Sequence, residues 1–579
     1  MTHIMKITTP LHWRYLFLLA FLVTLLALPL AVQGQADNFN DGNTATHYVT
    51  WFEYDAVSNL TAGASGPQAF WDALPGSNVY HLTATPYPAG GSLGLARVSS
   101  FPPDVYTNFY VSVDVTNNVT TYSQVFGLLA RAGDFSTPGT PTTRGYAFVY
   151  ANGSVSYPGG DNYLAIFRLK NDLQTAGVPG TGSDGSLTHC ELHGVNLDRT
   201  KQHRFVFIGR GTHLEGRVYQ LPNVTTPIAV LNADTALAPG APQHTNGQCG
   251  VLAFNLADAA GAPFSGPVDV TFDNYYASAR CPMNINDMVI KDNFNDGNDT
   301  APTVAWAHYD PISDAVGFAQ NTWTFPGGNS YRLQAPVQAF DPALGQGRVA
   351  SLAPGVQTDF RMAVEIVNWD DTIGANIGVL ARVGTPGLGT TTGYTFTYDS
   401  SGAENIDVSR ITGEAPTGLS LAGHKDMKMI PGNSYRLVFS GKGSELRTLV
   451  FELPNTMIPL IDCVVTDATY ASGVQGLLGS ARNAGSTVDV TFDNYSDTPL
   501  AAPAVSVAVG STPGGNITVS WPGNLECIWV LESSPAVGAG AVWTDVPLVN
   551  VAYAAGKNTY TGATPMAASG NTYYRLKQL

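Results

Sequence analysis

The sequence predicts an all-β protein: two antiparallel β-sandwiches in tandem and a third, smaller β-sandwich at the C-terminal end. Three observations carry this prediction. Two motifs that bracket a long segment both occur twice, apolar residues alternate with polar ones along many short segments, and clusters of Gly, Pro, Asn, Asp and Ser separate these segments. Alternation places every second side chain on one face of a strand, and the clusters are typical of turns. No long run has the period of a helix.

The bracketing motifs give the domain count. The first segment opens with Asp37-Asn-Phe-Asn-Asp-Gly-Asn43 and closes with Val268-Asp-Val-Thr-Phe-Asp-Asn-Tyr275. The second opens with Asp292-Asn-Phe-Asn-Asp-Gly-Asn298 and closes with Val488-Asp-Val-Thr-Phe-Asp-Asn-Tyr495. A chain of 579 residues is too long for one hydrophobic core. We therefore expect two domains of one kind, in which the opening and closing strands pair with each other.

The predicted boundaries divide the chain into a signal peptide (1–36), a first repeat (37–279), a linker (280–291), a second repeat (292–497), a second linker (498–503) and the small β-sandwich (504–579). The first part has Lys6 and Arg14, then an apolar run and the small residues Gly34 and Ala36. This order is typical of a secretory signal peptide. An uncleaved membrane anchor is the alternative, because the run is nearly long enough to span a bilayer. We expect a secreted or cell-surface protein that contacts the membrane only if the signal segment is uncleaved.

Charge excludes one class of partner. Lys and Arg number 28 against 44 Asp and Glu, which gives a formal net charge of −16. A protein that binds nucleic acid needs a basic surface to neutralise phosphates. We therefore expect no nucleic-acid partner.

Further motifs recur in the same order in both repeats. Gly127-Leu-Leu-Ala-Arg131 matches Gly378-Val-Leu-Ala-Arg382, and Arg144-Gly-Tyr-Ala-Phe148 matches Thr392-Gly-Tyr-Thr-Phe396. Together with the bracketing motifs, they resemble the concanavalin A-like, laminin G-like jelly rolls of bacterial secreted proteins. The resemblance covers both repeats. It implies two jelly-roll β-sandwiches that bind glycan or protein, and it implies no particular ligand.

The C-terminal part has alternating segments of its own, among them Val505–Val509 and Ile517–Trp521. Its layout resembles the short fibronectin III-like or immunoglobulin-like modules that end many secreted proteins of planctomycete and verrucomicrobial type. A module of under about 80 residues buries little apolar surface. We therefore expect it to pack against a neighbour or against the cell surface.

The bracketing motifs also supply candidate metal ligands. Calcium takes about six to eight oxygen ligands from carboxylates and carbonyls. The motif carboxylates are Asp37, Asp41 and Asp273 in the first repeat and Asp292, Asp296 and Asp493 in the second. If the opening and closing strands pair, each set converges, which makes calcium the candidate cofactor. The alternative is that these residues form turns in which the carboxylates accept local N–H groups.

Tryptophan rings are the candidate sugar contacts, because an aromatic face stacks on the apolar patch of a pyranose. The candidates are Trp51, Trp71, Trp306, Trp323 and Trp369. The first four occupy matched positions in the two repeats, and Trp369 follows a strand, where we expect an exposed loop. Burial in the core is the alternative for all of them. Exposed rings would favour sugar binding, and buried rings would favour a structural role.

The chain has five cysteines. An exported protein can form disulfides, and Cys190 with Cys249 is the first pair to test because both lie in the first repeat. The second repeat contains only Cys463. A disulfide therefore cannot be essential to the shared fold.

The two-carboxylate chemistry of glycoside hydrolases makes a specific demand on the sequence. Retaining enzymes need two carboxylates about 5 Å apart. The nearest pair, Glu53-Tyr-Asp55, is replaced by His308-Tyr-Asp310 in the second repeat. We therefore expect an exported, non-catalytic binding protein that recognises extracellular polysaccharide. The alternative is a structural or adhesive cell-envelope protein whose repeats are spacers that contact cell-surface proteins, and a glycoside hydrolase with an unrecognised site stays open as a third.

Overall fold

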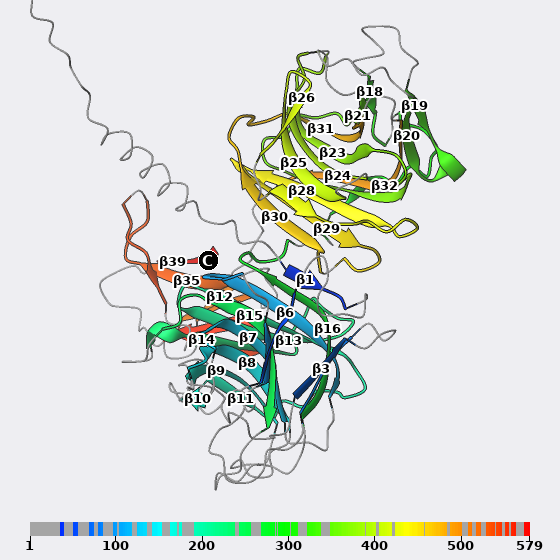
Figure 1. The fold of residues 1–579 in the computed structure, drawn as a ribbon. Helices are drawn as coiled ribbons and strands as arrows, with labels where there is room; N and C mark the ends of the chain where they lie inside the picture. The colour runs from blue at the N-terminus through cyan, green and yellow to red at the C-terminus, as the bar shows by residue number, and fades with distance from the viewer. Residues whose placement is uncertain are drawn as a thin grey trace, which may run out of the picture.

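The computed structural model confirms an all-β protein, whose described elements are antiparallel strands and two short 3-10 helices, η1 (Thr235–Leu237) and η2 (Pro326–Gly328) (Figure 1). None of its described helical segments has the length and apolarity needed to cross a bilayer. The structure describes residues 35–39, 50–55, 69–73, 79–84, 97–100, 104–118, 124–135, 142–152, 162–170, 173–175, 190–237, 243–255, 268–283, 285, 288–300, 303–310, 321–336, 348–387, 389–400, 404–419, 423–456, 458–482, 487–500, 508–511, 517–522, 528–538, 540–546, 551–554, 557–562 and 573–578.

The first repeat is a sandwich of two antiparallel sheets. Its strands are β1 (Gln35–Asp37), β2 (Phe52–Asp55), β3 (Ala69–Ala73), β4 (Tyr80–Ala84), β5 (Arg97–Ser100), β6 (Phe109–Asn118), β7 (Gln124–Gly133), β8 (Arg144–Asn152), β9 (Tyr163–Lys170), β10 (Leu173–Thr175), β11 (Cys190–His193), β12 (His203–Arg210), β13 (His213–Gln220), β14 (Ala229–Asp234), β15 (Gln248–Asn255) and β16 (Val268–Ser278). The back sheet has the order β14-β13-β12-β6-β16-β4-β3, and β1 also pairs with β16. The front sheet has the order β10-β9-β8-β7-β15-β5-β2, and β11 also pairs with β9.

The second repeat has the same two sheets. Its strands are β17 (Ile290–Asp292), β18 (Ala307–Tyr309), β19 (Thr322–Thr324), β20 (Tyr331–Ala335), β21 (Arg348–Leu352), β22 (Phe360–Trp369), β23 (Ala375–Gly384), β24 (Thr392–Asp399), β25 (Asn405–Thr412), β26 (Ala415–Gly418), β27 (His424–Asp426), β28 (Tyr435–Lys442), β29 (Glu445–Glu452), β30 (Ile461–Thr466), β31 (Val474–Ala481) and β32 (Val488–Pro499). The back sheet has the order β19-β20-β32-β22-β28-β29-β30, with β17 on β32. The front sheet has the order β18-β21-β31-β23-β24-β25-β26, with β27 on β25.

The strand orders of the two repeats correspond one to one, so the sequence repeat is a structural repeat. The predicted pairing of opening and closing strands is also confirmed. In the first repeat β1 pairs with β16, which places Asp37 opposite Tyr275. In the second repeat β17 pairs with β32, which places Asp292 opposite Tyr495.

The alternating pattern decides which side chains enter the core. In β6, Val111 and Val113 point inward and pack with Phe126 and Leu128 of the facing β7. Each of these side chains is fully buried. Burial of such a residue stabilises the fold by about 1.5–3 kcal/mol, so the two inner faces hold the sandwich together.

The C-terminal module has two small sheets. Its strands are β33 (Ala508–Ser511), β34 (Ile517–Pro522), β35 (Trp529–Ser534), β36 (Thr544–Asp545), β37 (Val551–Ala554), β38 (Lys557–Gly562) and β39 (Tyr573–Gln578). They form the sheets β33-β34-β38-β37 and β36-β35-β39.

The C-terminal module packs on the first repeat, although the second repeat precedes it in the chain (Figure 1). Its Val519 and Trp521 share one buried cluster with Val206 and Ile208 on the outer face of β12. The Tyr553 hydroxyl donates to the Pro227 carbonyl at 2.7 Å. The expectation that so small a module packs against a neighbour is confirmed, and the neighbour is the first repeat.

Three strands extend past the predicted boundaries. Gln35 and Ala36, within the predicted signal peptide, lie in β1 and pair with β16. Ile290 and Lys291 of the first predicted linker lie in β17, and residues 498–499 of the second predicted linker lie in β32. These residues continue the sheet hydrogen bonding beyond the motifs that defined the boundaries. The remainder of the predicted signal peptide, residues 1–34, lies outside the described residues.

A buried polar network joins the two repeats. Asp462 of β30 accepts hydrogen bonds from the Tyr276 hydroxyl at 2.6 Å and the Ser278 hydroxyl at 3.0 Å, both from β16. Arg447 of β29 donates to both Asp462 oxygens at 2.8 Å and to the Cys281 carbonyl at 2.9 Å. Burial raises the pKa of Asp462, but Arg447 and the two hydroxyls outweigh it, so the pKa lies below its ordinary value. The second repeat therefore contributes a charged pair that the first repeat helps to bury.

Candidate functional site

The opening aspartates hold the matched tryptophans in the core. Asp37 accepts the Phe39 N–H at 2.8 Å with one oxygen and the Trp51 Nε1–H at 2.9 Å with the other. Asp292 and Trp306 repeat this bond at 2.9 Å. Trp51 and Trp306 are 6% and 7% exposed. The prediction that these two rings are sugar platforms is therefore wrong, because their faces are covered by core residues.

The other tryptophan candidates occupy different environments. Trp369, which was expected in an exposed loop, ends β22 and is 6% exposed, so this prediction is also wrong. Its ring packs edge-on against Tyr435 with the ring centroids 5.9 Å apart. Trp323 is half-buried and stacks on His308 at 4.1 Å. The backbone of Trp71 pairs with β4, and its side chain lies outside the described part of the structure.

The motif carboxylates are arranged as hydrogen-bond acceptors. Both oxygens of Asp37 and of Asp292 already receive N–H groups. Asp273 and Asp493 accept the N–H of the following asparagine at 2.6 and 2.7 Å. Asp296 accepts the Asn298 N–H and the Thr303 hydroxyl, each at 3.2 Å.

These contacts favour the turn interpretation of the motifs over calcium binding. In the described part of the chain, no group of three His, Cys, Asp or Glu side chains is arranged to hold a metal ion. Asp41 lies outside the described residues. Burial, with a smaller contribution from neighbouring Asp114, raises the pKa of Asp273 to about 7. The motif residues that the structure describes do not form a metal site.

The predicted disulfide between Cys190 and Cys249 is wrong. Both are free thiols buried in the core of the first repeat, and burial raises the pKa of Cys249 to about 12. Cys463 is also a buried free thiol. Cys281, which lies between the repeats, is disulfide-bonded.

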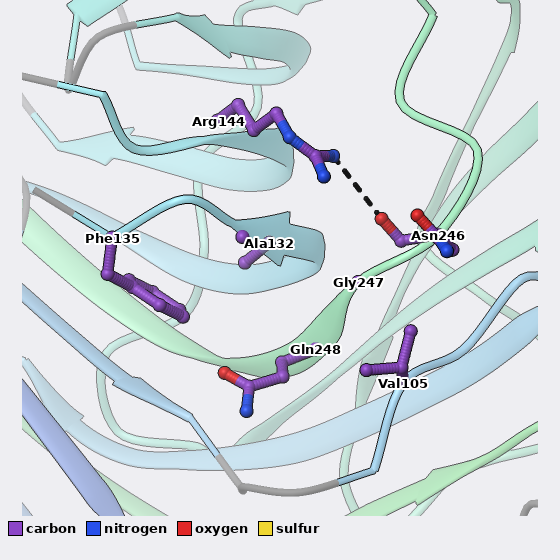
Figure 2. A pocket seen from close by; sticks show the side chains of 8 residues that line it. Val105, Ala132, Phe135, Arg144, Asn246, Gly247 and Gln248 are labelled. Atoms are coloured by element: carbon purple, nitrogen blue, oxygen red, sulfur yellow. Dashed lines mark hydrogen bonds between the residues drawn. The ribbon is translucent and has the colours of Figure 1, made fainter.

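A pocket of about 350 Å³ opens at one end of the front sheet of the first repeat. Its lining comes from the chain before β6, the end of β7, the start of β8 and the start of β15. The lining residues are Val105, Ala132, Gly133, Phe135, Arg144, Asn246, Gly247 and Gln248. Figure 2 shows Arg144 and Gln248 on opposite sides of the pocket, with Phe135 at one end and Val105 and Asn246 at the other.

Strand irregularity creates the pocket. The β7–β8 ladder has a bulge between Ala130 and Gly133, with Arg131 at φ 48°. A bulge bends the strand and redirects its side chains. A Cβ on Gly247 would lie 2.3 Å from the Ala132 carbonyl oxygen, so this position needs glycine where the chain crosses β7. The bulge at the end of the Gly-Leu-Leu-Ala-Arg motif thus shapes the pocket, although Arg131 itself does not line it.

The polar and apolar groups of the pocket are held by their neighbours. Phe135 packs against Phe52 and Tyr54, each with a ring-centroid distance of 5.4 Å. Arg144 donates from Nε to Asp134 at 2.5 Å and from Nη1 to the Asn246 carbonyl at 3.4 Å. An aromatic ring at one end of the pocket is therefore flanked by hydrogen-bond donors and amide groups. This combination suits a ligand with one apolar face and polar edges.

Key side chains of the pocket lining differ between the two repeats. In the second repeat, Pro386 stands in place of Phe135, Thr392 in place of Arg144 and Val474 in place of Gln248. None of the lining side chains was among the predicted site residues, because the sequence comparison weighed what the repeats share. The sequence did contain a signal for the pocket, namely a difference between the repeats: Arg144 is the first residue of a shared motif in one copy, and Thr392 is the first residue in the other.

The outer faces of the two front sheets also differ. At four matched positions the first repeat has Val125, Ala147, Val149 and Ala151, whereas the second has Asn376, Thr395, Thr397 and Asp399. In the first repeat these residues belong to an apolar cluster. In the second repeat, Asp399 forms an ion pair with Arg482. The two repeats therefore do not present the same chemistry on the same sheet.

No protein-family model matches the chain, and no curated protein sequence matches it. Among solved structures, it is similar to a carbohydrate-binding module, CBM66, from Bacillus subtilis, with 17% identity, a TM-score of 0.21, and coverage of 28% of this chain and 94% of that one. It is similar to the calcium-bound exoplasmic/lumenal domain of VIP36 (9% identity, TM-score 0.25, coverage 37% and 90%). It is also similar to a legume lectin-like domain from Entamoeba histolytica (10%, 0.24, 34% and 90%). These values assign neither a function nor a ligand to the chain.

Proposed function

We propose that the chain is an exported, non-catalytic protein that binds extracellular polysaccharide, with the pocket of the first repeat as its binding site. The observation that carries the proposal is the placement of Phe135 at one end of a cavity of about 350 Å³, with Arg144 and Gln248 on its opposite sides. A sugar ring has an apolar C–H patch and a rim of hydroxyl groups. The ring of Phe135 suits the patch, and the guanidinium and amide suit the hydroxyls.

The size of the cavity sets the scale of the ligand. Small-molecule pockets measure about 300–1,000 Å³, so this one suits a single sugar unit or the end of a chain. Val105 is 45% exposed at the rim and extends the apolar surface beyond the cavity. A polysaccharide would therefore be recognised at one unit, with adjoining units lying over the rim.

The test is binding of the full chain to a panel of soluble polysaccharides, measured by affinity electrophoresis. The pocket variant carries Gln248→Val, the residue of the second repeat, together with Phe135→Ala. The control carries Val356→Ala, an exposed residue of the second repeat at the position that matches Val105. Retardation by at least one polysaccharide, lost in the pocket variant and kept in the control, supports the proposal. Equal retardation of the pocket variant and the wild type would show that the pocket is not the binding site. Release of sugar from the polysaccharide would contradict the proposal that the protein is non-catalytic.

The second candidate function is a structural or adhesive role in the cell envelope. It is favoured by the buried matched tryptophans and by the Asp462–Arg447 network that fixes the repeats to each other. In this role the repeats are rigid spacers that contact cell-surface proteins. The same panel separates the two candidates, because a spacer shows no polysaccharide retardation.

A further inference from the structure

Arg144 presents one edge of its guanidinium to the pocket. Asp134 holds the Nε edge at 2.5 Å, Nη1 also donates to the Asn246 carbonyl at 3.4 Å, and the side chain is 30% exposed. Its Nη2 lies 3.4 Å from the place that a Cβ on Gly133 would occupy, so the fork lies close over the backbone of the pocket wall. The Nη1–Nη2 edge of a guanidinium binds a carboxylate through two parallel N–H bonds.

A second arginine lies buried behind the pocket wall. Arg131, next to Ala132, donates to the carbonyls of Thr107, His244 and Gly211, and no described carboxylate pairs with it. In the second repeat the matching Arg382 has a carboxylate oxygen of Asp359 at 3.9 Å.

Arg131 lacks this counter-ion because an asparagine, Asn108, stands where the second repeat has Asp359. Asp359 accepts the Gly443 N–H at 2.8 Å, and at the same place in the first repeat Asn108 accepts the Gly211 N–H at 3.0 Å. The backbone bond is kept while the negative charge is absent. The cation in the first repeat is therefore less compensated than its equivalent in the second.

A second carboxylate is absent from this end of the first repeat. Arg410 pairs with Asp467 at 2.9 Å in the second repeat. The matching residues in the first repeat are Arg168, from the same register of the sheet, and Thr235, which makes the same turn hydrogen bond as Asp467.

The charge of the two ends is compared at five positions. Two carboxylates of the second repeat are absent from the first, and Arg144 replaces Thr392, so three changes make the first repeat more positive. Asp134 replaces Thr385, and Asp104, next to the lining residue Val105, replaces Gly355, so two changes make it more negative. Over these five positions the pocket end is more positive than its equivalent by one charge, in a chain whose net charge is −16.

From this local positive field, and on the basis of the proposed function, we infer that the pocket binds a sugar unit bearing a carboxylate, as in a uronic acid. The carboxylate pairs with the Nη1–Nη2 edge of Arg144, and the sugar ring lies between Phe135 and Gln248. The buried charge of Arg131 strengthens the attraction from behind the wall, because a low-dielectric site screens charge less than water does.

The test uses the full chain and pairs of probes that differ in one group. The methyl glycosides of glucose, galactose and mannose are compared with those of the corresponding uronic acids, and with glucose sulfate, by ligand-observed NMR titration. At least one uronate is expected to bind about tenfold more tightly than its neutral partner at low salt, and this preference shrinks at high salt.

Three variants locate the charge effect. Arg144→Thr, the residue of the second repeat, abolishes the preference. Asn108→Asp, which restores the counter-ion of the second repeat and leaves the lining intact, reduces it about threefold. Arg410→Thr removes a similarly exposed arginine from the second repeat and leaves it unchanged.

The possible outcomes separate this inference from the proposed function. Equal binding of neutral and acidic sugars, a preference that persists in Arg144→Thr, or an Arg144-dependent preference for the sulfate over every uronate overturns the inference and leaves polysaccharide binding in place. Binding of none of the probes, together with no retardation by any polysaccharide, overturns both.

Discussion

The junction between the repeats gives the sharpest stability prediction. Asp462→Asn removes the charge that compensates Arg447 while keeping the size of the side chain. Asp462 is fully buried in the junction and receives hydrogen bonds from Tyr276, Ser278 and Arg447. Removing one partner of a buried pair costs about 3–5 kcal/mol, because the other charge stays buried and uncompensated.

The matched control lies at the same junction. Arg280 and Glu445 also pair across it, at 2.7 Å, but both side chains are more than two-fifths exposed, at 44% and 42%. Glu445→Gln is therefore expected to cost less than about 1 kcal/mol. Urea unfolding, followed by far-ultraviolet circular dichroism, measures both variants. An Asp462→Asn loss no greater than that of Glu445→Gln would refute the claim that the network stabilises the junction.

Three further predictions concern the first repeat. Burial lowers the pKa of His244 to about 4 from an ordinary 6.5, so the stability it contributes is present above pH 6.5 and is lost as the pH falls toward 4. His244→Tyr, which copies Tyr470 of the second repeat, should reduce this loss by about 1–3 kcal/mol in urea unfolding measured across that pH range. An unchanged dependence of stability on pH would contradict the assignment. Gly247→Ala should destabilise the repeat by about 1–3 kcal/mol, because its Cβ would meet the backbone of β7 at 2.3 Å, and a melting temperature within error of wild type would contradict this. Among the described cysteines, Cys190, Cys249 and Cys463 are buried free thiols, so thiol labelling without reductant should modify these three after unfolding and essentially none of them before it. Labelling of any of the three in the native chain would show that the core is open.

The fold could be predicted from the sequence because its signals are local. The alternation in Phe109–Val115 predicts one buried face, and the structure places Val111 and Val113 of that face in the core. The duplicated brackets predict the repeat and the pairing of its opening and closing strands, which the structure confirms. The docking of the C-terminal module on the first repeat could not be predicted, since nothing local distinguishes the outer face of β12 from any other alternating strand.

The candidate site was missed for a physical reason. Residues that two repeats share tend to be those that both folds need, and Trp51 and Arg131 are such residues, since one is bonded to Asp37 and the other to three carbonyls. A ligand site that exists in one repeat appears instead where the copies differ, as at Arg144 and Gln248. The shared tryptophans Trp51 and Trp306 are therefore core residues, whereas residues that differ between the repeats line the pocket.

The central claim is that the pocket of the first repeat holds a sugar unit. A crystal of the full chain soaked with the tightest oligosaccharide from the binding panel tests it most directly. The account predicts electron density for one sugar ring between Phe135, Arg144 and Gln248, with an anionic group on the guanidinium. Density for the oligosaccharide on the second repeat or on the C-terminal module, with this pocket empty, would contradict it.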